Sequence, residues 1–534
     1  MKHYILLLSM MLSAPLALMA QNAVTTEEHQ LTTVNNPWLQ TDNAAGLGRS
    51  TYSDHAMASI GVETFGGDYH RAQEGNRVNK LDFFAESYTH LSKNWIAWGS
   101  FRFNMMREKE RAWSDVIDTY ESSPYIFGSS VKGSYDTQMF DLHIKLARTT
   151  KGIATFGATV DYKVADVSRQ RDPRSRTQLA DYTLRPSILF ALGAHSDIGV
   201  TGAYRWKKEK LPNVTTVQED PNILYYTMLG MEQASATAAG FKGFQRQFVS
   251  AYWGGDIQYR MHCASNQLLL SVGALFENQK IEEEIKHSPG SFKAYHLNVD
   301  VYFNHQSDKT LLAVTWKNYY KKGHANENLQ ELVTTRDATT GITSQEWVTL
   351  YTYNERYRTI NYHSDLDISL RNSARNSNDY GWLVALKGRI NGFQQAYSMP
   401  TSTNNVKMAM VGLKGSIRLF KKNDMSLRLT AHADYGFNLK NDLKLAASSL
   451  KALSLSSTSY EIGSYNYATN VIEVDKAHFD AHYTQVGAEA QFNFPISIKN
   501  SKLNSFVKAY CSSLHANQGM GNWNGGGIAF GVIL

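Results

Sequence analysis

The sequence predicts an all-β fold, a single transmembrane antiparallel β-barrel of about 18 strands (range about 14–18), and three observations predict it. Segments of about 10 to 15 residues that alternate between apolar and polar side chains recur along most of the chain. The connections between these segments alternate between short turns and much longer stretches. No apolar run of about 18 residues follows the N-terminal leader, which excludes a helical membrane protein.

The first twenty residues have the layout of a secretory signal peptide. Lys2 and His3 precede an apolar stretch, Tyr4–Leu18, and Ala20 provides a small residue before Gln21. No cysteine follows the expected cleavage site, so a lipid anchor is not expected. We therefore expect residues 1–20 to be cleaved and the mature chain to reach the outer membrane of a Gram-negative bacterium.

The composition suits a membrane barrel and argues against other classes of protein. Aromatic residues make up 12% of the 534 residues, and only every second residue of a barrel strand faces lipid, so little average hydropathy is expected. The 54 basic and 48 acidic residues balance too closely for a nucleic-acid partner. Cys263 and Cys511 are too few and too far apart for a disulfide framework, and we expect both to be free.

Residues 21–54 show no sustained alternation and contain the phrase NPWLQTDNAAGLGRS. They predict a separate N-terminal segment, periplasmic or plug-like, ahead of a barrel over residues 55–534. Whether this segment occludes the lumen or leaves it open is not decided by the sequence pattern.

From residue 55 onward, period-two alternation predicts the strands of the barrel. We expect them at about 55–65, 81–90, 95–106, 137–148, 153–167, 181–193, 198–207, 245–262, 267–280, 291–304, 310–320, 357–371, 380–394, 406–420, 425–437, 478–494, 503–515 and 523–534. Most are longer than the five or six residues typical of soluble sheets. A tilted strand needs about 9–11 residues to cross a bilayer, so the lengths fit a membrane wall.

The connections separate a membrane barrel from a soluble sandwich, which shows the same alternation. Short turns follow every second strand, near Leu91, Arg148, Gly193, Cys263, His305 and Lys421. The intervening connections are mostly long, at 107–136, 207–244, 321–356 and 438–477. Short periplasmic turns and long extracellular loops are typical of outer-membrane barrels.

The last strand carries the alternation to the end of the chain. Its predicted lipid face consists of Ile528, Phe530, Val532 and Leu534. Because closing strands of outer-membrane barrels end the chain in this way, we expect the barrel-assembly machinery to recognise this strand.

Several phrases resemble outer-membrane barrel proteins of Bacteroidetes, in particular a family of about this length. They are the leader, NPWLQTDNAAGLG, YTLRPSILFALG (182–193) and the terminal GIAFGVIL. This resemblance implies a location and a fold and carries over no catalytic or ligand residues. The stretch DNAAGLG (42–48) is also similar to the NPAGL phrase of FadL-type fatty-acid transport barrels, with Ala44 where that phrase has proline.

With the apolar set facing lipid, the opposite face predicts a polar lumen of mixed charge. Its candidate residues are Arg102, Asp141, His143, Lys145, Asp161, Lys163, Arg185, Arg205, Asp256, Arg260, His296, Asp300, His363, Asp365, Asp367, Lys387, Arg389, Lys414, Arg418, Arg428, His432 and Asp434. One interpretation is a lumen that conducts small solutes, and the other is a lumen filled by paired charges.

Histidine and carboxylate side chains share this face and could bind a transition metal. The groups are His296 with Asp300, His363 with Asp365 and Asp367, and His432 with Asp434. They lie on separate strands, so the sequence predicts no metal site and no cofactor.

Two loop segments have patterns of their own. Ser168–Arg176 (SRQRDPRSR) is basic and could contact lipopolysaccharide or an anionic ligand, but the pattern favours a solvated loop. Leucines at near-helical spacing in Leu439–Leu455 predict a short loop helix that packs on the barrel mouth or on a partner, with a structural role as the default.

The predicted function is passive or substrate-gated passage of a small solute across the outer membrane. The alternative is a non-conducting accessory barrel that binds a surface lipoprotein or receptor in a nutrient uptake system, such as one for iron or haem. No GxSxG motif occurs, and an enzyme is not expected. No plug domain of the size found in energy-coupled receptors is apparent either, so the chain is not expected to act as such a receptor by itself.

Overall fold

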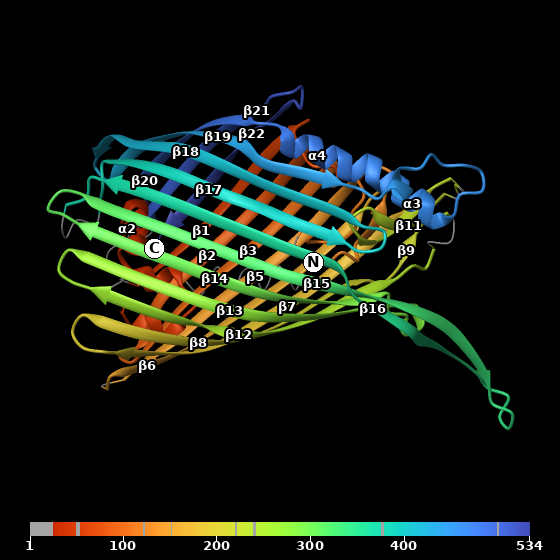
Figure 1. Cartoon of the computed structure of the whole chain (residues 1–534). Helices are drawn as coiled ribbons and strands as arrows, with labels where there is room; N and C mark the ends of the chain where they lie inside the picture. The colour runs from red at the N-terminus through yellow and green to blue at the C-terminus, as the bar shows by residue number, and fades with distance from the viewer. Residues whose placement is uncertain are drawn as a thin grey trace.

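The computed structural model (Figure 1) describes residues 25–49, 54–120, 123–150, 152–218, 220, 222–238, 242–374, 379–498 and 501–533. It confirms the predicted all-β fold, a closed antiparallel barrel of 18 strands. The predicted signal peptide and Leu534 lie outside the described residues.

Each strand expected from the sequence has one counterpart in the barrel wall. The wall strands are β1 (His55–Gly67), β2 (Arg77–Ser92), β3 (Trp95–Arg111), β5 (Gly133–Thr149), β6 (Ala154–Arg169), β7 (Arg174–Ala191), β8 (Ser196–Leu211), β12 (Arg246–His262), β13 (Asn266–Glu283), β14 (Gly290–Gln306), β15 (Leu311–Arg336), β16 (Thr343–Arg371), β17 (Trp382–Tyr397), β18 (Ser402–Lys422), β19 (Met425–Lys444), β20 (Tyr483–Ile498), β21 (Ser501–Ala516) and β22 (Asn522–Ile533). Neighbours in the chain pair antiparallel, and β22 pairs with β1 from Met57↔Ile533 to Gly67↔Trp523, which closes the wall.

The outward face of the wall is apolar and exposed. Val160 on β6 lies opposite Ile144 on β5 and Leu184 on β7, and these three side chains are 41–48% exposed. Similar exposed apolar side chains recur on other strands, for example Val200, Ile257 and Leu413. An apolar surface that surrounds a barrel is unfavourable in water and typical of a lipid-facing wall. No helix in the described part of the chain is long and apolar enough to cross a bilayer.

The long connections contain more regular structure than the sequence pattern predicts. The expected loop 321–356 was wrong. Strand β15 pairs with β14 as far as Glu327, and residues 328–336 and 343–352 then continue β15 and β16 as a two-stranded arm that projects from the barrel (Figure 1, green). The basic stretch Ser168–Arg176 is mostly strand, and residues 170–173 alone join β6 to β7. Short strands β4 (Phe127–Ser129), β10 (Leu224–Gly230) and β11 (Gln233–Ala238) form a separate sheet, and β9 (Val214–Thr215) pairs with β7.

The helix predicted over Leu439–Leu455 was wrong. Residues up to Lys444 pair with β18 as part of β19, and a single 3₁₀ turn, η4 (Ala447–Leu450), follows. The helices come later, as α3 (Ser459–Tyr467), η5 (Ala468–Ile472) and α4 (Glu473–Asp480), so β20 starts at Tyr483 rather than at residue 478. A capping box fixes the start of α3, where Thr458 accepts from the Glu461 backbone and the Glu461 carboxylate accepts from the Thr458 backbone.

The inward face of β22 is almost free of side-chain bulk. Gly525, Gly527 and Gly531 lie on this face, and rings from neighbouring strands cover them: a Cβ on Gly527 would lie 2.7 Å from the hydroxyl of Tyr510, and a Cβ on Gly531 would lie 2.3 Å from the ring of Phe506. Aromatic rings of the neighbouring strands therefore occupy the space that side chains of β22 would otherwise fill at the seam.

Candidate functional site in the barrel lumen

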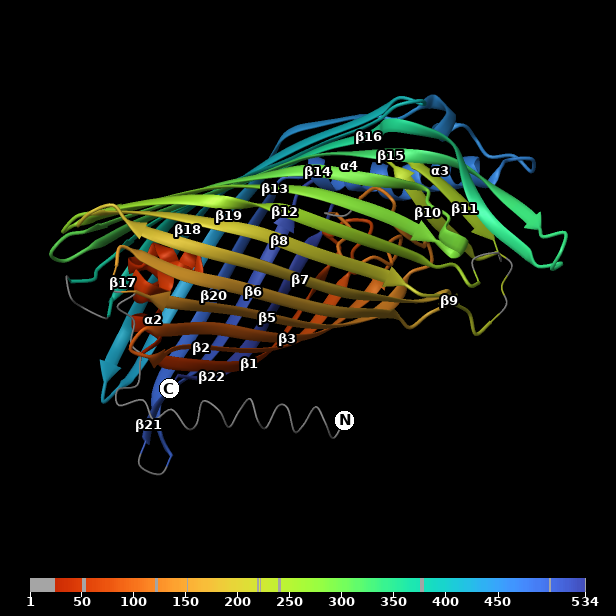
Figure 2. The ribbon, with the colours of Figure 1, turned by 90° about the horizontal axis from the view of Figure 1, so that it is seen from below.

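The N-terminal segment, residues 25–49, lies inside the barrel at the end where the short turns gather (Figure 2, red). It consists of α2 (Thr26–Asn35), η1 (Pro37–Gln40) and η2 (Ala44–Arg49). The Thr25 hydroxyl accepts from the Glu28 backbone amide at 3.1 Å and so caps α2. Pro37, which has no amide hydrogen to donate, starts η1.

Polar side chains from widely separated strands bind the backbone of this segment. The Lys145 ammonium on β5 donates to the Thr41 carbonyl at 2.6 Å, and the Thr159 hydroxyl on β6 donates to the Asp42 carbonyl at 2.8 Å. On the facing part of the wall, Tyr302 of β14 donates to the Gln40 carbonyl at 3.3 Å. The segment is therefore held from several sides of the barrel.

The segment also packs tightly against the wall. Trp38 is 1% exposed and packs with Ala45, Leu189, Leu269 and Tyr302. Gly157 of β6 lets the backbone of the segment approach closely, since a Cβ there would lie 2.3 Å from the amide nitrogen of Ala45. Glycine at this wall position is required by the approach of the segment.

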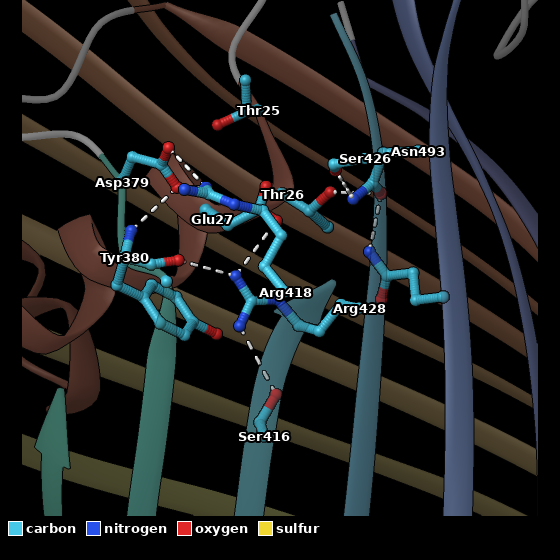
Figure 3. A network of polar contacts seen from close by, with 12 residues as sticks. Thr25, Thr26, Glu27, Asp379, Tyr380, Ser416, Arg418, Ser426, Arg428 and Asn493 are labelled. Carbon is cyan, nitrogen blue, oxygen red and sulfur yellow. Dashed lines mark hydrogen bonds and ion pairs between the residues drawn. The ribbon is translucent and has the colours of Figure 1, made fainter. Parts of the chain in front are cut away.

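A buried polar network anchors the start of the segment (Figure 3). The Arg428 guanidinium lies 3.3 Å from the Glu27 carboxylate and donates to the Tyr380 carbonyl at 2.8 Å. Its guanidinium carbon also lies 4.1 Å from the centre of the Tyr380 ring. The Thr26 hydroxyl donates to Asn493 at 2.8 Å, and Asn493 in turn donates to Ser426.

Replacement of Arg428 by alanine is expected to weaken this anchor. Arg428 and Glu27 are 5% and 6% exposed, and loss of one partner of a buried ion pair costs about 3–5 kcal/mol. We expect faster amide hydrogen exchange across α2 in Arg428→Ala. Arg418→Ala is the matched control, because Arg418 pairs with Asp379 and not with the segment. Unchanged exchange in α2 of Arg428→Ala would contradict this account.

The long loops fold into a cap at the opposite end of the lumen. Its core contains Trp113, Phe127, Tyr225, Tyr226 and Tyr467 from four different stretches of the chain. The cap packs on inward side chains of one side of the wall, namely Leu211, Phe248, Ile281, Phe292, Ala294, Ala325, Tyr357 and Tyr397. Among the described residues, the buried members of this core include none from β1–β3 or β20–β22, and on that side the cap contacts the β1–β2 connection instead.

A charged contact ties α4 of the cap to the β1–β2 connection. The Arg71 guanidinium contacts the Asp475 carboxylate at 2.5 Å and lies 3.5 Å from the centre of the Tyr120 ring. Asp475 also accepts from the Ala72 backbone amide at 2.9 Å. Although burial lowers the pKa of Arg71, the neighbouring Asp475 carboxylate outweighs this effect and raises it, so the guanidinium stays charged.

Lower pH is expected to loosen α4. His478 on this helix stacks on Tyr69 with ring centres 4.2 Å apart, and burial lowers its pKa to about 4 although Asp475 opposes the shift. An undocked His478 with a pKa near about 6.5 binds more protons than the docked one, so docking weakens as pH falls from about 6.5 to 4. Hydrogen exchange of α4 should accelerate over that window and stay constant above it, and His478→Gln should remove the dependence.

Two spaces border these elements. A cavity of about 110 Å³ lies beneath the cap, and its lining includes Arg71, Gln73, Asn361, Gln395 and Asn404 together with aromatic rings. A recess of about 1040 Å³ is lined by residues of β1, β2, β3, β5, β21 and β22, among them Glu63, Lys80 and Tyr510. Lys80 lies 3.2 Å from Glu63, and Tyr510 donates to Glu63 at 2.5 Å.

Contacts with the N-terminal segment show which side chains point inward on β5, β6, β7, β12, β14 and β19, and the strand register extends this assignment to their neighbours. By the same alternation, the side chains that the sequence assigned to the lumen lie on the inward face: Arg102, Asp141, His143, Lys145, Asp161, Lys163, Arg185, Arg205, Asp256, Arg260, His296, Asp300, His363, Asp365, Asp367, Lys387, Arg389, Lys414, Arg418, Arg428, His432 and Asp434. Ile528 and Phe530 of the closing strand are 58% and 41% exposed on the outward face.

Opposite charges on the inward face pair along and across the strands. Asp161 contacts both His143 and Arg185, and Arg185 lies 3.6 Å from Asp42 of the segment. His296 lies 2.9 Å from Glu277, which also contacts Lys321, and Asp365 contacts His363 and Arg389. The three histidine–carboxylate groups considered for a metal therefore remain apart on β14, β16 and β19.

The structure brings together a group that the sequence pattern did not single out. Within the described ranges, His29, His55 and Glu86 form the one set of three histidine, cysteine or acidic residues close enough to bind a metal ion together. No local spacing joins them, because they come from α2, β1 and β2. Cys263 and Cys511 are both free.

Comparisons with known proteins find a matching family model and several solved structures of low similarity. A family model described as "Family of unknown function (DUF6850)" matches residues 44–534. The copper transporter OprC matches with 9% identity over 89% of this chain and 81% of its own, with a TM-score of 0.35. The ferric yersiniabactin uptake receptor FyuA from Yersinia pestis matches with 8% identity over 89% and 80%, with a TM-score of 0.36. No curated protein sequence matches the chain.

Proposed function

Because the chain belongs to the DUF6850 family, a family of unknown function, we propose its role from its own geometry. It is an outer-membrane barrel that passes a small hydrophilic solute, and its N-terminal segment closes the inner end of the lumen. The observation that carries this proposal is the position of residues 25–49 inside the barrel, bound to the wall by hydrogen bonds and packing.

The wall itself supports a place in the outer membrane. Its outward face is a continuous set of exposed apolar side chains, and both described ends of the wall, His55 and Ile533, lie at the short-turn end. In outer-membrane barrels the short turns face the periplasm and the longer loops face outward. On this proposal, outer-membrane lipids and lipopolysaccharide surround the barrel.

The route that we propose runs along the seam. The buried core of the cap rests on β8 and β12–β17, whereas the recess of about 1040 Å³ lies along β1, β2, β3, β5, β21 and β22. An 18-stranded barrel is too wide to be filled by wall side chains alone. The charges beside the seam, such as Glu63 and Lys80, are of both signs, which suits a small polar solute without selecting a net charge.

Conductance in planar bilayers tests this function. We expect few or no steps from the full-length protein and large, steady steps from a protein that lacks residues 21–54. Steps of equal size and frequency from both proteins would contradict a closing role for the segment. Silence from both, with insertion verified by protease protection, would contradict passage of a solute.

A second candidate is a non-conducting accessory barrel, and the projecting arm favours it. The β15–β16 arm extends beyond the wall and exposes Leu329, Val348, Leu350 and Tyr351 by 42–58%. An exposed apolar arm offers a surface for a lipoprotein or receptor partner. Silence from both proteins in the conductance experiment would favour this role.

A further inference from the structure

The contact between the N-terminal segment and the first two wall strands contains side chains suited to a metal ion. His29 projects from α2, His55 is the first residue of β1, and Glu86 lies on β2. Their candidate ligand atoms all lie within 4.8 Å of one another. We propose that these three residues bind a divalent transition-metal ion, which fastens the segment to the wall.

The geometry needs only small side-chain adjustments. The His29 Nε2 atom lies 2.9 Å from the Glu86 carboxylate, and the rings of His29 and His55 lie 5.4 Å apart. A tetrahedral ion with ligands at about 2.0–2.1 Å separates neighbouring ligand atoms by about 3.3 Å. The candidate ligand atoms already lie within 4.8 Å of one another, so the change needed to reach that spacing is of the size that rotation about side-chain bonds provides.

The surroundings favour binding and hold the ligands in place. His55 is 5% exposed and stacks on Tyr88 at 6.1 Å between ring centres, with the two ring planes 15° apart. The Glu86 side chain is 9% exposed and that of His29 is 22% exposed, so the site is sheltered but reachable at its outer edge. Fixed, partly desolvated ligands lose little entropy when an ion binds.

The ligand set indicates the class of ion. Two imidazoles and one carboxylate suit Zn²⁺, Cu²⁺, Ni²⁺ or Fe²⁺, and lack the oxygen ligands that Ca²⁺ or Mg²⁺ requires. Three protein ligands leave a fourth tetrahedral position for water. Binding needs neutral imidazoles, so affinity should fall in acid.

The position of the site links metal binding to closure of the lumen. One ligand belongs to the segment and the other two to β1 and β2, of which β1 forms the seam with β22, so a bound ion joins the closing element to the wall beside the proposed route. This regulatory role rests on the proposed function, whereas the binding of the metal does not.

Isothermal titration of Zn²⁺ into the full-length protein, freed of metal with a chelator and kept in detergent, tests the site. We expect one bound ion per chain, and at least about tenfold weaker binding in His29→Gln and in Glu86→Gln. His432→Gln is the matched control, because His432 lies on the inward face of β19 beside Asp434 and outside the group. Absence of binding, or equal affinity in all four proteins, would overturn the site.

Hydrogen exchange tests whether a bound ion fastens the N-terminal segment to the wall. Zn²⁺ should slow exchange in residues 25–49 of the wild type and leave that of His29→Gln unchanged. His29 is on the segment, so its replacement leaves the wall strands intact and the variant still assembles. Binding without any change in exchange would overturn the fastening role.

Conductance with and without Zn²⁺ then distinguishes the two proposals. Suppression by Zn²⁺ of residual steps in the wild type, but not in His29→Gln, supports both. Zn²⁺ binding together with silence of the protein lacking residues 21–54 retains the metal site and overturns the proposed passage of a solute.

Discussion

Gly157→Val is expected to turn a silent barrel into a conducting one. A Cβ at this position would lie 2.3 Å from the amide nitrogen of Ala45 and 2.7 Å from the carbonyl carbon of Ala44, so η2 must move away. Valine is otherwise favourable in a strand, and the wall should assemble as before. We expect steps in planar bilayers and faster hydrogen exchange over residues 40–49.

Gly415→Val provides the control for this substitution. Nothing lies within 4 Å of a Cβ at Gly415, so the same added bulk meets no neighbour. This variant should remain as silent as the wild type. A silent Gly157→Val barrel with unchanged exchange over residues 40–49 would show that the close approach of the segment does not keep the lumen shut.

Val160→Arg is expected to reduce the stability of the barrel in lipid by about 2–4 kcal/mol, the cost of an arginine on the lipid face near the middle of the bilayer. Val160 is 42% exposed near the middle of β6, and its cross-strand neighbours Ile144 and Leu184 are apolar and exposed as well. The new guanidinium would therefore lose its hydration without gaining a partner. Urea-dependent unfolding in lipid vesicles measures the loss.

Thr159→Arg places the same side chain on the opposite face of β6, so its effect can be compared with that of Val160→Arg. Thr159 is fully buried and donates to the Asp42 carbonyl, so an arginine there disturbs the segment in the lumen rather than the lipid contact. We expect a smaller loss of barrel stability than in Val160→Arg, together with faster exchange in the segment. A loss of about 2–4 kcal/mol in Thr159→Arg, together with wild-type stability in Val160→Arg, would mean that the faces are inverted.

The wall could be predicted from the sequence because each strand carries its own signal. Alternation such as Phe140, Leu142 and Ile144 against Asp141 and His143 depends on neighbouring residues alone. Since a hairpin fixes the register of its two strands, the order of strands and the direction of each face followed.

The lumen could not be predicted in the same way, because its contacts join distant parts of the chain. The fit of Asp42 against Thr159, or of Asn43 against Gln258, leaves no periodic trace in either stretch. Similarly, His29, His55 and Glu86 meet only because α2 lies inside the closed wall. The tryptophan, asparagine and glycines of NPWLQTDNAAGLG, which interrupt any regular pattern, were the available sign of a closely packed segment.

The helices of the cap and the projecting arm show two further limits. Leucines at 439 and 443 matched a helical spacing, but the residues up to Lys444 pair with β18 and extend β19. The arm exists because β15 and β16 keep pairing beyond the wall, and nothing in an alternating pattern marks where a wall ends. Tertiary pairing decided both cases.

The glycines on the inward face of β22 have a consequence for biogenesis. Strands β1 and β22 lie at opposite ends of the described wall, so their pairing closes the longest loop in the molecule, has the largest entropic cost and is expected to form last. A strand with little inward bulk can join β1 through backbone hydrogen bonds after the lumen has already filled, without displacing what is inside. The rings of Phe65, Phe506 and Tyr510 can then settle over the glycines once the two edges have met.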